Sequence, residues 1–351
     1  MFLKIFLKIL PIFNQYNESQ KSNSMKTKLS FLLLIILQIS FAQGYLKELK
    51  SGYKGGFIPE LKLVDNSLNF LVLGDWGRNG EYFQKDVALQ MSKAAATIDS
   101  QFVISVGDNF YPIGVQSTQD SQWKTSFEDI YYNFHLQTPW YIALGNHDYY
   151  GNIQAQIDYS KISRRWNLPS NYYSKTIKLN DGSKVLLVFI DTNPFINSYY
   201  SKENDVAEKV KKQDTIAQKN WLINTLQKAD ASIKWKIVIG HHPMYSGGKR
   251  KESQDTKDIE ATFAPILDQY KVDAYLCGHE HDLQIIRPKD RLTTQFLSGA
   301  GSEIRPTGNR EGTIFALSEG GFMTFSITPQ LLVAQLVNAQ GKVVFTQELT
   351  K

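Results

Sequence analysis

Five short segments of the chain follow one pattern, in which an apolar run is followed by glycine and then by polar side chains. Apolar runs of this length that end at glycine are typical of buried strands. The residues after the glycines are Asp, Asn, His and Tyr, which are side chains that bind hard or borderline metal ions. Five of the six histidines lie in these segments, and only His135 lies outside them. The segments are FLVLGD (70–75), FVISVGDNFY (102–111), WYIALGNHD (140–148), WKIVIGHHP (235–243) and AYLCGHEH (274–281).

The spacing between the segments predicts strands that alternate with helices. Alternation of this kind, followed by a strand-rich C-terminal part, indicates an α/β core completed by antiparallel strands. In open α/β sheets, ligands bind beyond the carboxyl ends of the strands, where all five segments place their polar residues. We expect strands at 69–73, 102–106, 139–144, 184–190, 234–239 and 273–277, helices at 82–98, 120–133, 216–229 and 257–270, and mostly strands over 292–348.

Composition excludes few classes of protein. The chain is 42% apolar and 21% charged, which is ordinary for a globular protein. The net charge of +5 comes without an arginine-rich stripe, so we do not expect nucleic-acid binding, although a mildly basic surface favours anionic substrates. The polar segment 193–215 reads as a solvated surface loop, or alternatively as a flank of the active-site mouth.

The N-terminus has the features of a secretory signal. A basic start at Met25 is followed by an apolar run and by small residues before Gln43, so we predict a signal peptide over 25–42 and a single domain over 43–351. Residues 1–24 read as an over-called start. The alternative to a cleaved signal peptide over 25–42 is an uncleaved anchor. The mature protein is then periplasmic or secreted, without stable membrane insertion. The single cysteine, Cys277, forms no internal disulfide and is expected to be a small buried residue.

The polar residues of the five segments match what a pair of metal ions needs. Two ions about 3.5–4 Å apart require a bridging ligand, several terminal ligands and an open side for water and substrate. Asp75 and Asp108 are candidates for the bridge, and Asn146 offers an amide oxygen. Imidazole ligands are available from three further positions, His241, His279 and His281.

The order GD, GDN, GNHD, GH, GHxH resembles the metallophosphoesterase (calcineurin-like) superfamily over about residues 66–345. Its details look like the purple acid phosphatases, particularly the small tartrate-resistant type 5. Most of the superfamily has a histidine two residues after the first aspartate, where this chain has Gly77. In purple acid phosphatases a tyrosine three residues after the second aspartate supplies the missing ligand, and Tyr111 stands there.

The resemblance implies a fold, a cofactor and roles for individual residues. The fold is a four-layer αββα sandwich of two mixed β-sheets flanked by helices. His147 resembles the family's histidine that contacts substrate or leaving group, with Asp148 orienting its ring. Asp75, Tyr111 and His281 would hold Fe³⁺. Asn146, His241 and His279 would hold a divalent ion, which is Fe²⁺, Zn²⁺ or Mn²⁺. Asp108 would bridge the two ions.

The chain departs from the small members of the family at one position. They carry a further histidine about nine residues after the ligand of the fourth segment, and Arg250 stands there. The second acid/base residue is therefore unassigned, and His242, Lys249 or Arg250 are candidates for binding phosphate instead.

These features predict an exported, monomeric acid phosphatase that acts on small-molecule phosphate esters. It would hydrolyse phosphomonoesters by attack of a metal-bound hydroxide, and the leaving group would take a proton from His147 or from water. Two alternatives remain open: a phosphodiesterase on the same scaffold, and a non-enzymatic exported binding protein on an inactivated phosphatase scaffold.

Overall fold

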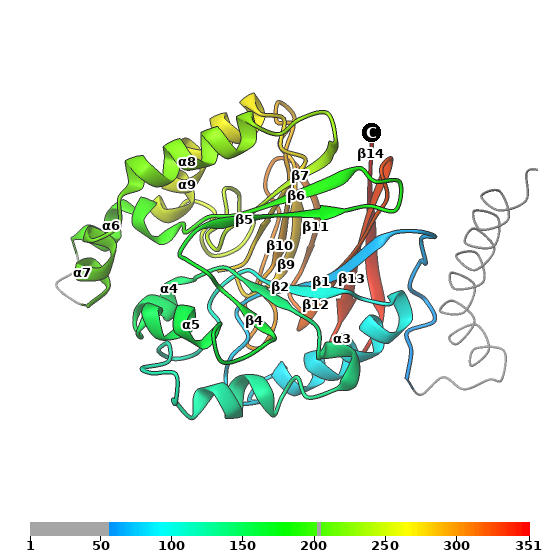
Figure 1. The fold of residues 1–351 in the computed structure, drawn as a ribbon, viewed down its shortest axis with the longest axis horizontal. Coiled ribbons are helices and arrows are strands. Elements are labelled where there is room, and N and C mark those ends of the chain that lie inside the picture. Colours follow the sequence, from blue (N-terminus) through cyan, green and yellow to red (C-terminus); the bar gives the residue numbers. More distant parts are fainter. Residues whose placement is uncertain (1–55, 202–204) are drawn as a thin grey trace, which may run out of the picture. The chain divides into compact units, whose positions relative to one another are not determined.

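Two seven-stranded β-sheets form the centre of the structure, a computed structural model that describes residues 56–201 and 205–351 (Figure 1). The predicted signal peptide and residues 43–55 lie outside the described residues. The strands of the first sheet, in spatial order, are β14 (Val343–Thr350), β13 (Leu331–Asn338), β12 (Gly321–Ile327), β1 (Leu68–Leu73), β2 (Phe102–Ser105), β3 (Trp140–Ile142) and β4 (Trp166–Asn167). Those of the second are β11 (Thr313–Leu317), β9 (Leu283–Ile286), β10 (Thr294–Ser298), β8 (Ala274–Cys277), β7 (Ile233–Ile239), β6 (Lys184–Phe189) and β5 (Tyr173–Lys178).

Both sheets are mixed, as predicted. In the first sheet β1, β2, β3 and β4 run parallel, whereas β12 pairs antiparallel with β1. In the second sheet β6, β7 and β8 run parallel, whereas β5 pairs antiparallel with β6. Parallel neighbours need long crossover connections, and antiparallel neighbours need only short turns, which matches the change from alternating helices to consecutive strands along the chain.

Alternate residues of β1 point into two different parts of the core. Phe70 and Val72 of β1 pack in one apolar cluster with Ile237 and Ile239 of β7, so this cluster lies between the sheets. Leu71 belongs to the other cluster, which contains the buried faces of the helices. The inner strands β1, β2 and β8 are largely buried on both faces, which explains why they read as continuous apolar runs, whereas the edge strands β5 and β14 are partly exposed.

Helices cover the outer faces of the sheets, and the predicted four-layer arrangement is confirmed. The helix α3 contacts β1, β12 and β13 of the first sheet, while α8 and α9 lie beside the second sheet (Figure 1). Cys277 is buried and free, as expected. The helical segments are α3 (Gln84–Ile98), η3 (Trp123–Glu128), η4 (Phe134–Leu136), α4 (Asn146–Tyr149), α5 (Ile153–Tyr159), η5 (Asn193–Phe195), α6 (Asn197–Tyr200), α7 (Asp205–Lys211), α8 (Thr215–Gln227) and α9 (Gln254–Gln269).

Two predicted segments differ from the structure. The helix expected at 120–133 is reduced to the six-residue π-helix η3. The reason is that its aromatic side chains Trp123 and Phe127 pack into a tertiary cluster with Trp166. The segment 193–215 is mostly helical rather than a solvated loop, and α6 packs against α9. Within 56–201 and 205–351, no helix has the length and apolar content needed to cross a bilayer.

Candidate metal centre

The carboxyl ends of strands from both sheets bring the predicted ligands together. Asp75 and Asp108 follow the neighbouring strands β1 and β2, and Asn146 is the first residue of α4, after β3. The histidines follow β7 and β8, which are neighbours in the second sheet. Asp75, Asp108 and His241 offer ligand atoms that all lie within 4.8 Å of one another. The edges of the two sheets therefore supply one shared cluster.

The hydroxyl of Tyr111 lies at the centre of one half of this cluster. Its oxygen is 2.7 Å from Oδ2 of Asp108, 3.0 Å from Oδ1 of Asp75 and 3.2 Å from Nε2 of His281. A phenol has a single proton to donate, so it cannot donate fully to both carboxylates at once. Converging lone pairs without enough protons between them are the arrangement expected around a cation.

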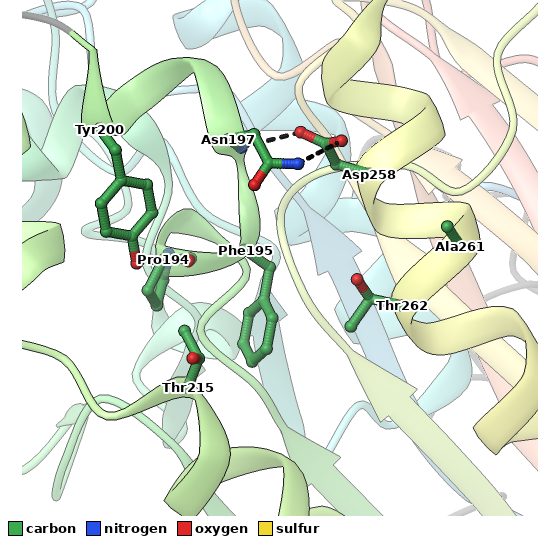
Figure 2. A pocket seen from close by; sticks show the side chains of 8 residues that line it. All are labelled: Pro194, Phe195, Asn197, Tyr200, Thr215, Asp258, Ala261 and Thr262. Carbon is green, nitrogen blue, oxygen red and sulfur yellow. Dashed lines mark hydrogen bonds between the residues drawn. The ribbon is translucent and has the colours of Figure 1, made fainter.

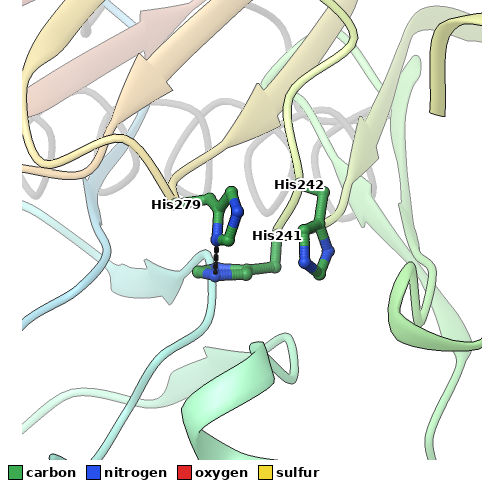
Figure 3. A group of neighbouring side chains, drawn as sticks. All are labelled: His241, His242 and His279. Carbon is green, nitrogen blue, oxygen red and sulfur yellow. Dashed lines mark hydrogen bonds between the residues drawn. The ribbon is translucent and has the colours of Figure 1, made fainter. Parts of the chain in front are cut away.

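The histidine half of the cluster presents two ring nitrogens to each other (Figure 3). Nδ1 of His241 donates to the carbonyl oxygen of Val106 at 2.9 Å, because a carbonyl only accepts, and Nε2 is therefore unprotonated in the neutral ring. That Nε2 lies 3.2 Å from Nδ1 of His279 and 3.4 Å from Oδ2 of Asp108. The backbone carbonyl thus orients His241 in the way that metal-binding histidines are commonly oriented.

A buried acceptor without a partner completes the set. Oδ1 of Asn146 is buried and has no hydrogen-bond partner among the residues that the structure describes. A buried amide oxygen without a partner is costly and requires an explanation such as an ion. The seven predicted ligands together offer carboxylate, phenol, amide and imidazole groups, and this donor set fits a pair of cations of different hardness.

Burial and mutual repulsion perturb the acidic groups of the cluster. Burial raises the pKa of Asp75 to about 7, and the neighbouring Asp108 adds to this shift while His241 opposes it. Burial alone would also raise the pKa of Asp108, but His241 and His147 outweigh it and hold that pKa well below its usual range. Two carboxylates this close cannot both ionise without a compensating positive charge, which a metal ion supplies when bound.

The imidazoles of His279 and His281 are kept neutral, as metal binding requires. Burial, followed by the positive charge of Arg250, lowers the pKa of His279 well below its usual value. Burial and the neighbouring Arg305 lower the pKa of His281 to about 2. His241 differs: burial lowers its pKa, but Asp108, Asp75 and the Val106 carbonyl together outweigh burial and raise that pKa to about 9.

The backbone is strained at three of the predicted ligands. Asp75, Asp108 and His279 have φ angles of 57°, 51° and 72°, in a region that non-glycine residues rarely adopt. Each such residue costs about 1–3 kcal/mol, and such strain is concentrated at functional sites. Two neighbouring glycines permit the close approach, because a Cβ on Gly145 would clash with the Asp108 carboxylate and one on Gly278 with that of Asp75.

His147 lies at the edge of the cluster, but Asp148 does not orient it as expected. The ring of His147 is partly exposed, and its Nδ1 donates to the carbonyl oxygen of Pro112 at 2.7 Å. Asp148 is buried and instead accepts hydrogen bonds from Gly145 and Asn109. Consecutive residues of a helix point about 100° apart, so the two side chains of α4 diverge. Asp148 therefore caps α4 and braces the loop after β2.

His242 is close to the cluster but presents its nitrogens elsewhere. Its Nδ1 lies 2.7 Å from the hydroxyl of Thr192 and its Nε2 lies 2.9 Å from that of Tyr199, while its ring packs 4.3 Å from the ring of His279 (Figure 3). This geometry supports the orientation of His279 rather than proton transfer or phosphate binding by His242. Arg250 lies beside the cluster, and its Nη1 donates to the carbonyl oxygen of His279 at 3.2 Å.

The segment 193–215 lies against this side of the cluster. Tyr199 of α6 reaches His242, and both the backbone and side-chain amides of Asn197 donate to Asp258 of α9. A pocket of about 480 Å³ lies between η5, α6, α8 and α9 (Figure 2). None of its eight lining residues is a predicted site residue: Pro194, Phe195, Asn197, Tyr200, Thr215, Asp258, Ala261 and Thr262.

Sequence reasoning missed charged residues that contact the predicted ligands, among them Arg78, Asp255 and Glu303. The guanidinium carbon of Arg78 lies 3.8 Å from the centre of the Tyr111 ring. Glu303 has Oε2 at 3.4 Å from Nδ1 of His281. Arg78 stands three residues after Asp75, so its nearness to the first segment was the available signal, whereas nothing in the local sequence marks Glu303.

Comparisons with known proteins agree with this geometry. Residues 68–283 match the calcineurin-like phosphoesterase family. The chain is 35% identical to purple acid phosphatase 7 of Arabidopsis thaliana, over 93% of this chain and 98% of the relative. It is 33% identical to tartrate-resistant acid phosphatase type 5 of Oryctolagus cuniculus, over 84% of this chain and 94% of the relative.

A solved structure supports the fold alone. GAP50, the anchor in the inner membrane complex of Plasmodium, superimposes with a TM-score of 0.69 at 24% identity, over 82% of this chain and 89% of that chain. With the family match and the two relatives, the assignment is clear. The chain belongs to the calcineurin-like phosphoesterase family and, within it, to the purple acid phosphatases.

Proposed function

We propose that this phosphatase is an exported acid phosphatase that hydrolyses phosphomonoesters at a centre of one ferric and one divalent ion. One observation carries the proposal: the side chains of Asp75, Asp108 and His281 all converge on the hydroxyl of Tyr111. A phenol among carboxylates is a hard donor set that suits Fe³⁺. The family acts on small phosphate esters, so the substrate class follows from membership.

The residues divide into two ligand groups that share one carboxylate. Asp75, Tyr111 and His281 would hold the ferric ion. Asn146, His241 and His279 would hold Fe²⁺, Zn²⁺ or Mn²⁺, which accept imidazole ligands. Asp108 has its Oδ2 close to both Tyr111 and His241, which supports its role as the bridge. When bound, the two ions supply Lewis-acid chemistry and neutralise the charge of the phosphate.

His147 is the residue that we assign to proton transfer. Its Nδ1–H is held by the Pro112 carbonyl, so Nε2 is the nitrogen left to exchange a proton with the leaving group. The backbone N–H of His147 also donates to Oδ1 of Asp108 at 2.7 Å, which ties its position to the proposed bridge. Arg250 adds a fixed positive charge beside His279 that favours an anionic substrate.

Export and the boundaries of the mature protein are part of the proposal. The Lys-rich start at Met25 and the apolar run after it support cleavage before Gln43, which would leave residues 43–351 as one monomeric catalytic domain. N-terminal sequencing of protein exported by the native host tests this. An intact 1–42 segment on soluble cytosolic protein would contradict it.

Metal analysis with a visible spectrum tests the centre, and two substrates test the reaction. Purified protein should contain two metal ions per chain, one of them iron, show a visible band from Tyr111 bound to Fe³⁺, and hydrolyse an aryl phosphate at acidic pH. Faster hydrolysis of a bis-aryl phosphate would instead identify a diesterase. All seven predicted ligands are present, so the site does not favour the alternative of a binding protein on an inactivated scaffold.

A further inference from the structure

The ring face of Tyr111 is covered by a cation. The guanidinium carbon of Arg78 lies 3.8 Å from the centre of that ring, well within the range of about 6 Å at which a cation and a ring attract each other. Tyr111 is buried, so little water screens the interaction. Arg78 is therefore placed to act on the charge that Tyr111 carries.

The position of Arg78 is held from two further directions. Its Nη2 forms an ion pair with Oε2 of Glu303 at 2.6 Å, and the same carboxylate oxygen lies 3.4 Å from Nδ1 of His281. The guanidinium carbon also lies 5.2 Å from the centre of the Tyr82 ring. Only 16% of the Arg78 side chain is exposed. A long side chain held in this way keeps one orientation, whereas a free surface arginine samples many.

We propose that Arg78 is a positioning residue that stabilises negative charge on the Tyr111 oxygen when that oxygen binds the ferric ion, and that Glu303 holds it there. The proposal rests on the proposed function, because it requires Tyr111 to be a ferric ligand. A positive charge against the ring lowers the energy of the phenolate electrons, and it would act less on an ion held at the ring oxygen. More energy is then needed to move an electron from phenolate to iron.

The visible band of the ferric protein reports this energy directly. In Arg78→Met the cation is lost while a side chain of similar length remains, so the band should move to longer wavelength. In Arg78→Lys the charge remains but the planar contact with the ring is lost, so the shift should be smaller and in the same direction. The Met variant should also release iron faster to a chelator, since the phenolate is less stabilised.

Arg310→Met provides a matched control. The Arg310 guanidinium carbon lies 5.1 Å from the centre of the Tyr245 ring, and Tyr245 is not a predicted ligand. This substitution removes an arginine from above a tyrosine elsewhere, so the band should stay at its wild-type wavelength. Iron content is measured in every variant, which separates a shift of the band from a loss of bound iron.

Each outcome decides the proposal. A shift to longer wavelength in Arg78→Met, smaller in Arg78→Lys and absent in Arg310→Met, supports it. A weaker band at an unchanged wavelength, in proportion to lost iron, would show that Arg78 only supports the fold and would overturn it. Wild-type protein that binds Fe³⁺ without any visible band would overturn the ferric assignment of Tyr111, and this proposal with it, before any variant is compared.

Discussion

Replacing His147 by alanine separates catalysis from metal binding. The structure places the ring at the edge of the cluster, partly exposed, with one hydrogen bond from Nδ1 to the Pro112 carbonyl. Loss of one such bond lowers the free energy of unfolding by about 0.5–1.5 kcal/mol. Loss of a positioned proton donor lowers the rate by about 10²–10⁴-fold, which corresponds to about 2.7–5.5 kcal/mol in activation free energy. The effect on turnover should therefore exceed the effect on stability several-fold.

The assay combines turnover of an aryl phosphate, metal content and thermal or urea unfolding of the same preparation. His147→Ala should retain both metal ions, since the ring nitrogens lie outside the two ligand groups. His135→Ala is the control, because His135 is exposed and lies outside the five segments. Loss of a metal ion in His147→Ala would move this residue among the ligands, and near-wild-type turnover would refute its role in proton transfer.

Three further substitutions test the other assignments. Asp108→Asn should lower the bound content of both metal ions and abolish turnover, because the Asp108 carboxylate lies against both halves of the cluster. Wild-type metal content in this variant would place the bridge elsewhere. Tyr111→Phe should remove the visible band while the fold is retained, because the buried ring keeps its volume; a persistent band would refute the ferric ligand. Asp148→Ala should lower the free energy of unfolding by about 3 kcal/mol, because it leaves the buried amides of Gly145 and Asn109 without their acceptor. Urea unfolding measures this change, and a decrease below about 1 kcal/mol would contradict the capping role.

The local sequence was sufficient to predict most of the strands, although not β4, β5 or β9, and to select the candidate ligands at the strand ends. Each predicted ligand stands a few residues after a continuous apolar run. Such a run is the usual sequence pattern of a strand that is buried on both faces. Because ligands gather beyond the carboxyl ends of strands, the sequence predicts that Asp75, Asp108 and His241 meet, although they follow strands of two sheets rather than one. The family resemblance added Tyr111, whose role no local pattern reveals.

Tertiary packing decided where the remaining side chains point. His242 follows His241 directly, yet Thr192 and Tyr199, 50 and 43 residues away in sequence, determine the direction of its two nitrogens. Glu303 approaches His281 from the chain that follows β10, and it also holds Arg78 over Tyr111. The position of the backbone follows from local patterns of apolar residues and glycine. Side-chain hydrogen bonds and charge contacts instead depend on partner residues from distant parts of the chain, which come close only when the two sheets pack. For that reason the ligand positions could be predicted from the sequence, and the contacts that orient His147, His242 and Tyr111 could not.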